Sequence, residues 1–142
     1  MELPAFEVVP AITGSRLLLL CDHAGPDLPP AYGTLGLKPE LFATHIAYDI
    51  GAATVTRALA RDFGAAAVLG RWSRLLIGLN RGADDPTLVM KLSDGVIIAG
   101  NRDADAREVV RRIAAFHAPY QVEVGRQAAR IEGFAVPVLV SL

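Results

Sequence analysis

Four short runs of mostly apolar residues place the tightest constraint on the fold of this chain. They occupy residues 17–21, 65–69, 74–79 and 136–142. Runs without a clear alternation of apolar and polar residues are typical of strands that are buried on both faces, as in a parallel sheet. Each run is much shorter than the ~20 apolar residues that a membrane-spanning helix requires. The runs therefore predict a soluble protein built on a largely parallel sheet.

Helical patterns lie between these runs. Residues 49–63 place apolar side chains on one face and arginines on the other, which predicts an amphipathic helix. Asp49 suits the N-cap of this helix, and Gly64 suits the residue that follows its last turn. A shorter helical stretch is expected to open at Pro39, because proline is favoured in the first turn of a helix.

A second long helix is expected in the last third of the chain. It should be capped by Asp103 or Asp105 and should carry apolar residues on one side. Pro119 has no N–H to donate, so it must kink or restart this helix. The helix is then expected to continue to about Ile131.

The order of these elements indicates a single α/β domain over residues 1–142, with a mainly parallel sheet flanked by helices. Residues 1–15 and 80–103 lack a clear pattern and are expected to be irregular, apart from a short strand at residues 96–98. Ligands of such sheets bind beyond the carboxyl ends of the strands. Polar residues that follow a predicted strand are therefore the first candidates for a functional site.

Composition excludes several classes of protein. The chain has 14 basic and 15 acidic residues and a formal net charge of −1, so it has no positive excess for binding nucleic acid. Cys21 is the only cysteine, which excludes an internal disulfide and a cysteine-based zinc finger. Because Cys21 lies inside a predicted buried strand, it is expected to be inert. The amino terminus lacks the features of a signal peptide, so we expect a cytoplasmic protein without membrane association.

His23 is the first candidate for chemistry. It follows the leucine-rich strand directly, in the segment Asp22-His23-Ala24-Gly25. A neutral imidazole at the carboxyl end of a strand can bind a metal or act as a base. The alternative is a loop histidine that is hydrogen-bonded to its surroundings.

His45 and Asp49 form a second candidate. Their i, i+4 spacing would place both on one face of a helix. Such a pair could supply two metal ligands, or one ligand and the carboxylate that orients it. The alternative is that Asp49 is only a helix cap and His45 only a packed side chain.

A third group of candidates surrounds the predicted strand at residues 74–79. Arg74 opens this strand, and Asn80 and Arg81 follow it. The planar guanidinium of arginine matches a carboxylate, and a neighbouring asparagine can add a hydrogen bond. These residues could therefore bind a substrate that carries a carboxylate, or they could be ordinary surface residues. Arg111 and Arg112 lie on a helix face and are expected to be solvated.

Six segments in this order resemble the N-formylglutamate amidohydrolase family across nearly the whole chain. The segments are Asp22-His23-Ala24-Gly25, Gly33-Thr34-Leu35-Gly36-Leu37, His45-Ile46-Ala47-Tyr48-Asp49-Ile50-Gly51-Ala52, Ser73-Arg74 to Asn80-Arg81, Gly100-Asn101 and His117-Ala118-Pro119-Tyr120. That family is distantly similar to zinc carboxypeptidases and aspartoacylase-type deacylases. The resemblance implies a phosphorylase/hydrolase-like fold.

The resemblance also implies roles for individual residues. His23 would be a ligand of zinc or another divalent metal, and Asp49 its acidic partner. Asn80 and Arg81 would hold the substrate carboxylate, with Arg74 nearby. The H-x-x-E pair of the wider superfamily is absent from this chain.

Three departures from the family pattern stand out. The family usually has Asp at the position of Gly78 and commonly has His at the position of Gln121. The family also continues past the strand at residues 136–142, so we expect the chain to be the N-terminal part of a catalytic domain, truncated at its C-terminus. The general base is expected beyond Leu142. The last strand is then expected to expose a sheet edge through which the chain self-associates.

The function implied by the resemblance is metal-dependent hydrolysis of the linear amide bond of an N-formyl amino acid. N-formylglutamate would give formate and glutamate, as in histidine degradation. One alternative is a deacylase for another N-acyl amino acid. A second alternative is a non-catalytic fragment or protein that binds an anion or a partner through Arg74 and Arg81.

Overall fold

A four-stranded sheet forms the centre of the computed structural model, which describes residues 3–12 and 14–142. The strands follow the order β1-β3-β2-β6, and β2 runs parallel to both β3 and β6. Their bounds are Phe6–Val9 for β1, Leu17–Cys21 for β2, Ala66–Gly70 for β3 and Val138–Ser141 for β6. The α/β class and the mainly parallel sheet are thereby confirmed.

Strand β1 departs from the expectation that residues 1–15 are irregular. It pairs antiparallel with β3 at the edge of the sheet. It is only four residues long, and all four are partly buried. Such a short edge strand lacks the continuous apolar run that identified the other strands, which explains why the sequence pattern missed it.

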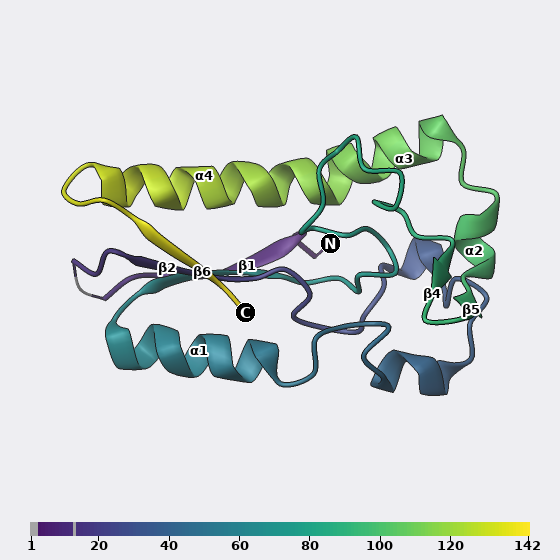
Figure 1. Ribbon diagram of the computed structural model, residues 1–142, viewed down its shortest axis with the longest axis horizontal. Coiled ribbons are helices and arrows are strands. Elements are labelled where there is room, and N and C mark those ends of the chain that lie inside the picture. The colour runs from purple at the N-terminus through teal and green to yellow at the C-terminus, as the bar shows by residue number, and fades with distance from the viewer. Residues whose placement is uncertain (1–2, 13) are drawn as a thin grey trace.

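Helices cover both faces of the sheet (Figure 1). The first face is covered by α1 (Ala52–Phe63), and the opposite face by α3 (Ala106–Arg112) and α4 (Ala118–Glu132). Alternate residues of β2 point to different layers: Leu19 packs with Ala60 of α1, whereas Leu18 belongs to the cluster that contains Tyr120 of α4. No helix among the described residues is long and apolar enough to cross a membrane.

The helix ends agree with the sequence in part. Gly64 ends α1 in the left-handed conformation, and the Asp105 side chain caps α3 by accepting a hydrogen bond from the N–H of Glu108 at 2.9 Å. The prediction that Asp49 caps α1 is wrong. The N-cap is Gly51, because a φ of +84° is needed there and glycine adopts it without strain. At Pro39, the expected helical stretch is a short 3₁₀ helix, Pro39–Ala43.

Pro119 follows a π-helical turn in the second long helix, at the place where a kink or a restart was expected. The helix continues from α3 through a π-helical turn, Ile113–His117, before α4 begins at Ala118. In this turn the N–H of Ala118 donates to the carbonyl of Ile113, five residues back. Pro119 lies in the first turn of α4 and has no N–H to donate to the helix that precedes it.

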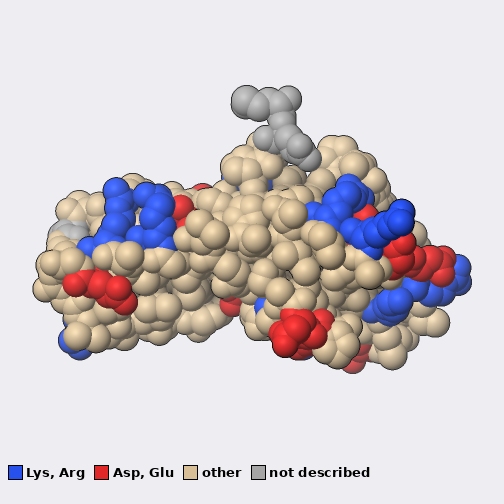
Figure 2. Space-filling model, turned by 90° about the horizontal axis from the view of Figure 1, so that it is seen from above, with Lys and Arg blue, Asp and Glu red and all other residues tan. Residues whose placement is uncertain are grey.

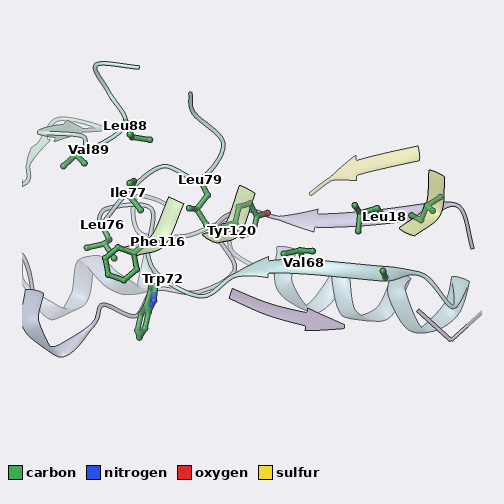
Figure 3. Close-up of a cluster of buried hydrophobic side chains, with 12 residues drawn as sticks. Leu18, Val68, Trp72, Leu76, Ile77, Leu79, Leu88, Val89, Phe116 and Tyr120 are labelled. Carbon is green, nitrogen blue, oxygen red and sulfur yellow. The ribbon is translucent and has the colours of Figure 1, made fainter. Parts of the chain in front are cut away.

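Residues 74–79 are not a strand, contrary to the prediction. They form buried turns that pack against the helix layer, and Figure 3 shows Leu76, Ile77 and Leu79 beside Phe116 and Tyr120. The backbone groups of this segment find partners outside any sheet; for example, the N–H of Gly78 donates to the carbonyl of Leu88 at 2.8 Å. An apolar run alone does not distinguish such a segment from a buried strand.

The short strand predicted at residues 96–98 is present as β5 (Val96–Ile97), which pairs with β4 (Leu92–Ser93) in a hairpin. The helix α2 (Ala99–Arg102) follows it. These elements lie at one end of the molecule, beyond the carboxyl ends of β2 and β3 (Figure 1). Figure 2, seen from the side of α3 and α4, shows acidic and basic side chains in small mixed groups rather than in one basic field.

Candidate functional site

The carboxyl end of β2 positions two side chains with different surroundings. Asp22 lines a pocket on the side of α4, whereas His23 is buried and its ring contacts Asp49. Gly70, at the end of β3, packs directly against this turn. A Cβ at position 70 would lie 2.2 Å from the carbonyl oxygen of Asp22 and 2.4 Å from a Leu79 methyl group, so only glycine fits. The close packing at the ends of β2 and β3 thus fixes the positions of Asp22 and His23.

His23, Asp49 and Arg74 form one cluster, although Arg74 was predicted to lie with Asn80 and Arg81. The Nδ1 of His23 lies 3.0 Å from Oδ2 of Asp49, and Nη1 of Arg74 donates to Oδ1 of Asp49 at 3.2 Å. The backbone supports the cluster, because Asp49 N–H donates to the carbonyl of His23 and Arg74 N–H to that of Ala47. The structure therefore brings these three residues together from separate parts of the chain.

The environment of His23 fixes its chemical form. Burial lowers the pKa of its imidazole, the Asp49 carboxylate opposes that shift, and the Arg74 charge adds to it. Because a carboxylate only accepts hydrogen bonds, Nδ1 carries the proton and Nε2 has a free lone pair. Nε2 is buried and has no hydrogen-bond partner. A neutral histidine oriented by a carboxylate in this way is the usual form of a metal-binding histidine.

The fit to a metal ion is therefore partial. Nε2 of His23 suits a ligand atom, and Asp49 suits the carboxylate that orients the ring. Catalytic zinc sites usually have three protein ligands. Among residues 3–12 and 14–142, no group of three or more His, Cys, Asp or Glu side chains is arranged to hold a metal ion. The described residues thus supply part of a metal site.

His45 takes no part in this cluster. Residues 44–50 form turns and bends rather than a helix, so the i, i+4 spacing does not place His45 beside Asp49. The His45 side chain is 73% exposed, and its Nε2 lies 3.1 Å from Oδ2 of Asp94. The prediction of a shared helical face is wrong because it assumed a helix that the chain does not form.

Asn80 and Arg81 line a pocket of about 520 Å³. The pocket lies where β2 and β6 end against α4, which is the position that parallel sheets favour for a ligand. Its walls come from four parts of the chain: Leu20, Asp22, Leu79, Asn80, Arg81, Gly82, His117, Tyr120, Gln121, Val124 and Ser141. His23, Asp49 and Arg74 do not line this pocket, so the structure places the predicted residues in two groups.

The guanidinium of Arg81 is only weakly engaged. Nη1 lies 3.5 Å from Oδ2 of Asp85, at the limit of a hydrogen bond, and the buried Nε has no partner. A Cβ at position 78 would lie 3.1 to 3.4 Å from three atoms of the Arg81 side chain. Gly78, which replaces the aspartate usual in the family, therefore leaves room for Arg81 to lie close to the backbone.

Asp22, Tyr120 and Ser141 are pocket residues that the sequence prediction missed. The Tyr120 hydroxyl donates to Oδ1 of Asp22 at 2.7 Å, and Oγ of Ser141 donates to Oδ2 at 3.2 Å. Burial and the nearby Asp22 charge raise the pKa of Tyr120, so it remains a donor. Figure 3 shows Tyr120 beside Leu79 at the end of β2. Asp22 precedes His23 directly, and its own position after the strand was the signal that could have identified it.

Unpaired polar atoms concentrate on the predicted residues. Among the described residues, five buried side-chain N or O atoms have no hydrogen-bond partner, and three of these are Nε2 of His23, Nε of Arg74 and Nε of Arg81. Buried polar atoms are normally paired, and exceptions often mark sites that bind a ligand or an ion. These unpaired atoms make both groups of residues candidates for ligand binding.

Comparison with known proteins gives consistent matches. Residues 15–142 match the family model for N-formylglutamate amidohydrolase. The crystal structure of gene product Atu2144 from Agrobacterium tumefaciens is 34% identical, with a TM-score of 0.92, and the match covers 97% of this chain and 55% of that chain. No protein among the curated sequences matches.

A second solved structure shares the fold. The N-formylglutamate amidohydrolase from Ralstonia eutropha JMP134 is 19% identical, with a TM-score of 0.80. The match covers 98% of this chain and 56% of that chain, and at this identity it shows the fold alone. The chain thus spans about half the length of both solved structures.

Proposed function

The chain belongs to the N-formylglutamate amidohydrolase family, and from this premise we propose that it acts in hydrolysing the amide bond of an N-formyl amino acid such as N-formylglutamate. The products would be formate and glutamate. The observation that carries the proposal is the pocket that contains Asn80 and Arg81 at the carboxyl ends of the parallel strands. Family membership supports the reaction class, and the pocket supports a substrate that carries a carboxylate.

Arg81 and Asn80 would bind the carboxylate of the substrate. Arg81 has a buried Nε without a partner and only one distant carboxylate contact. Its guanidinium can therefore donate hydrogen bonds to a bound anion. Charge-assisted hydrogen bonds of this kind contribute about 1.5–3 kcal/mol each. The volume of about 520 Å³ is within the usual range for small-molecule sites.

Zinc or another divalent metal is part of the proposal, with His23 as one ligand through Nε2. Such an ion supplies a Lewis acid and a bound water of lowered pKa. In the described chain, Asp49 orients the His23 ring, and Arg74 holds the other oxygen of Asp49. These contacts fix the ring and its free nitrogen, whichever residues complete the site, while burial and the Arg74 charge lower the pKa of the imidazole.

A second function rests on a specific observation. The His23 cluster and the Arg81 pocket are separate groups, so anion or partner binding through Arg81 does not require chemistry at His23. A third possibility keeps the reaction and changes the acyl group to acetyl or succinyl. These functions differ in whether an acid is released and in which acid it is.

Product analysis separates the three functions. The purified protein, supplied with zinc, is incubated with N-formyl-, N-acetyl- and N-succinylglutamate, and free formate, acetate and succinate are measured. We expect release of formate in preference to the other two acids. Preferential release of acetate or succinate would show a different deacylase, and binding of N-formylglutamate without release of any acid would favour the non-catalytic function.

A further inference from the structure

Three side chains from one continuous helix hold the segment that carries Asn80 and Arg81. Arg112 Nη1 donates to the carbonyl of Leu76 at 2.9 Å, and Gln121 Nε2 donates to that of Leu79 at 2.7 Å. His117 Nε2 lies 2.8 Å from the carbonyl of Arg81, and because a carbonyl only accepts, this nitrogen carries the proton. We name Arg112, His117 and Gln121 the carbonyl clasp.

The clasp replaces the sheet hydrogen bonds that this segment lacks. A buried carbonyl without a partner is costly, and here the partners are side chains rather than a neighbouring strand. Asn101 extends the arrangement, because its Nδ2 donates to the carbonyls of Leu75 and Met90 at 2.7 and 2.9 Å. His117 and Gln121 fix the backbone on both sides of Asn80, at Arg81 and Leu79.

The π-helical turn makes the clasp possible. In an uninterrupted α-helix, residues five apart are separated by about 500°, so His117 would point roughly 140° away from Arg112. The turn at Ile113–His117 contains a hydrogen bond that spans five residues, which widens the helix locally. Arg112 and His117 then face the same segment, and Gln121 follows four residues later on that face. Such turns often occur at functional sites.

We propose that His117 and Gln121 are positioning residues that set the place of Arg81 for binding the substrate carboxylate, an inference that rests on the proposed function. His117 binds the carbonyl of Arg81 itself, and Gln121 that of Leu79, two residues earlier. Both residues also line the pocket. His117 and Gln121 hold the backbone, whereas Arg81 would bind the substrate. Without either side chain, Arg81 should shift from its position, and binding of the carboxylate should weaken.

The test compares two identical substitutions on α4. Gln121→Met removes the donor to Leu79, whereas Gln127→Met removes a buried amide that donates to Glu123 instead. Calorimetric titration with N-formylglutamate should show about fivefold weaker binding for Gln121→Met, the equivalent of about 1 kcal/mol, and unchanged affinity for Gln127→Met. His117→Gln, which keeps an N–H donor, should retain more affinity than His117→Leu.

Amide hydrogen exchange tests the clasp without any substrate. The N–H of Arg81, which donates to the carbonyl of Gly78, should exchange faster in Gln121→Met than in Gln127→Met. Equal effects of both substitutions on exchange and affinity, or no effect of Gln121→Met, would overturn the proposal. If the wild-type protein does not bind N-formylglutamate at all, the proposed function fails, and the exchange comparison still decides whether the clasp orders this segment.

Discussion

His23 shows what a single residue can reveal before a structure is known. Its place directly after a strand predicted a functional position, and in the structure Asp49 holds Nδ1 and leaves Nε2 buried and unpaired. The partnership with Asp49 could not follow from spacing, because 26 residues separate the two. The i, i+4 spacing of His45 to Asp49 instead suggested a neighbour that the fold does not provide.

The first prediction concerns metal binding by His23. Replacing His23 with Ala should reduce the affinity for zinc, because its buried and unpaired Nε2 is the proposed ligand atom. His45→Ala is the matched control, since its side chain is 73% exposed and lies outside the cluster. Zinc bound per chain is measured by titration for the wild type and both variants. Equal affinity and stoichiometry in all three proteins would remove His23 from the metal site.

At the scale of elements, α3 and α4 do more than cover the sheet. Arg112 was expected to be solvated, yet its side chain is only 2% exposed and donates to Glu108, Asn101 and Leu76. The amphipathic pattern predicted the helix but not this burial, because the partners of Arg112 come from turns whose positions the sequence pattern does not specify. The same limit applies to residues 74–79, whose carbonyls are bound by side chains distant in sequence.

The second prediction concerns the ion pair between Glu108 and Arg112. Burial tends to raise the pKa of Glu108, but the hydrogen bonds from Arg112 and Arg111 outweigh it, and the net effect holds this pKa below its usual value of 4.5. A lowered folded-state pKa stabilises the fold above the unfolded-state value and loses that contribution as pH falls through the folded-state value. The pair should therefore stabilise the protein near neutral pH and stop doing so in acid.

Urea unfolding of Glu108→Gln tests this directly. At about pH 7 the variant should have a free energy of unfolding about 1–3 kcal/mol lower than the wild type, because Arg112 loses its charged partner. The difference should shrink as the pH is lowered below 4.5. Glu132→Gln, at the exposed end of α4, serves as the control. A constant difference across this pH range would mean that the carboxylate charge of Glu108 is not the source of the stability.

At the scale of the whole molecule, the continuous apolar runs predicted three of the four strands of the main sheet. Residues 17–21, 65–69 and 136–142 each contain a strand within one or two residues of the predicted bounds. The antiparallel strand β1 has no such run and was missed. The remaining apolar run, at residues 74–79, forms buried turns instead of a strand. The prediction of burial was correct there, and the prediction of a strand was wrong.

The third prediction concerns the sheet edge at β6. Among the described strands, β6 pairs only with β2, and Leu139 and Val140 are 48% and 36% exposed. An apolar strand with a free edge tends to pair with another chain. We therefore expect this chain to self-associate, and Val140→Lys to reduce the mass measured by light scattering. Val122→Lys, at an exposed apolar position of α4, is the control. Equal masses for the wild type and Val140→Lys would show that the edge is not the interface.

The central claim, that Arg81 binds the carboxylate of an N-formyl amino acid, is tested most directly by calorimetric titration with N-formylglutamate. Arg81→Ala is compared with the wild type and with Arg61→Ala, whose side chain is 73% exposed on α1. Loss of charge-assisted hydrogen bonds worth about 1.5–3 kcal/mol predicts roughly ten- to over one-hundredfold weaker binding by Arg81→Ala and no change for Arg61→Ala. A dissociation constant for Arg81→Ala equal to that of the wild type would contradict the account.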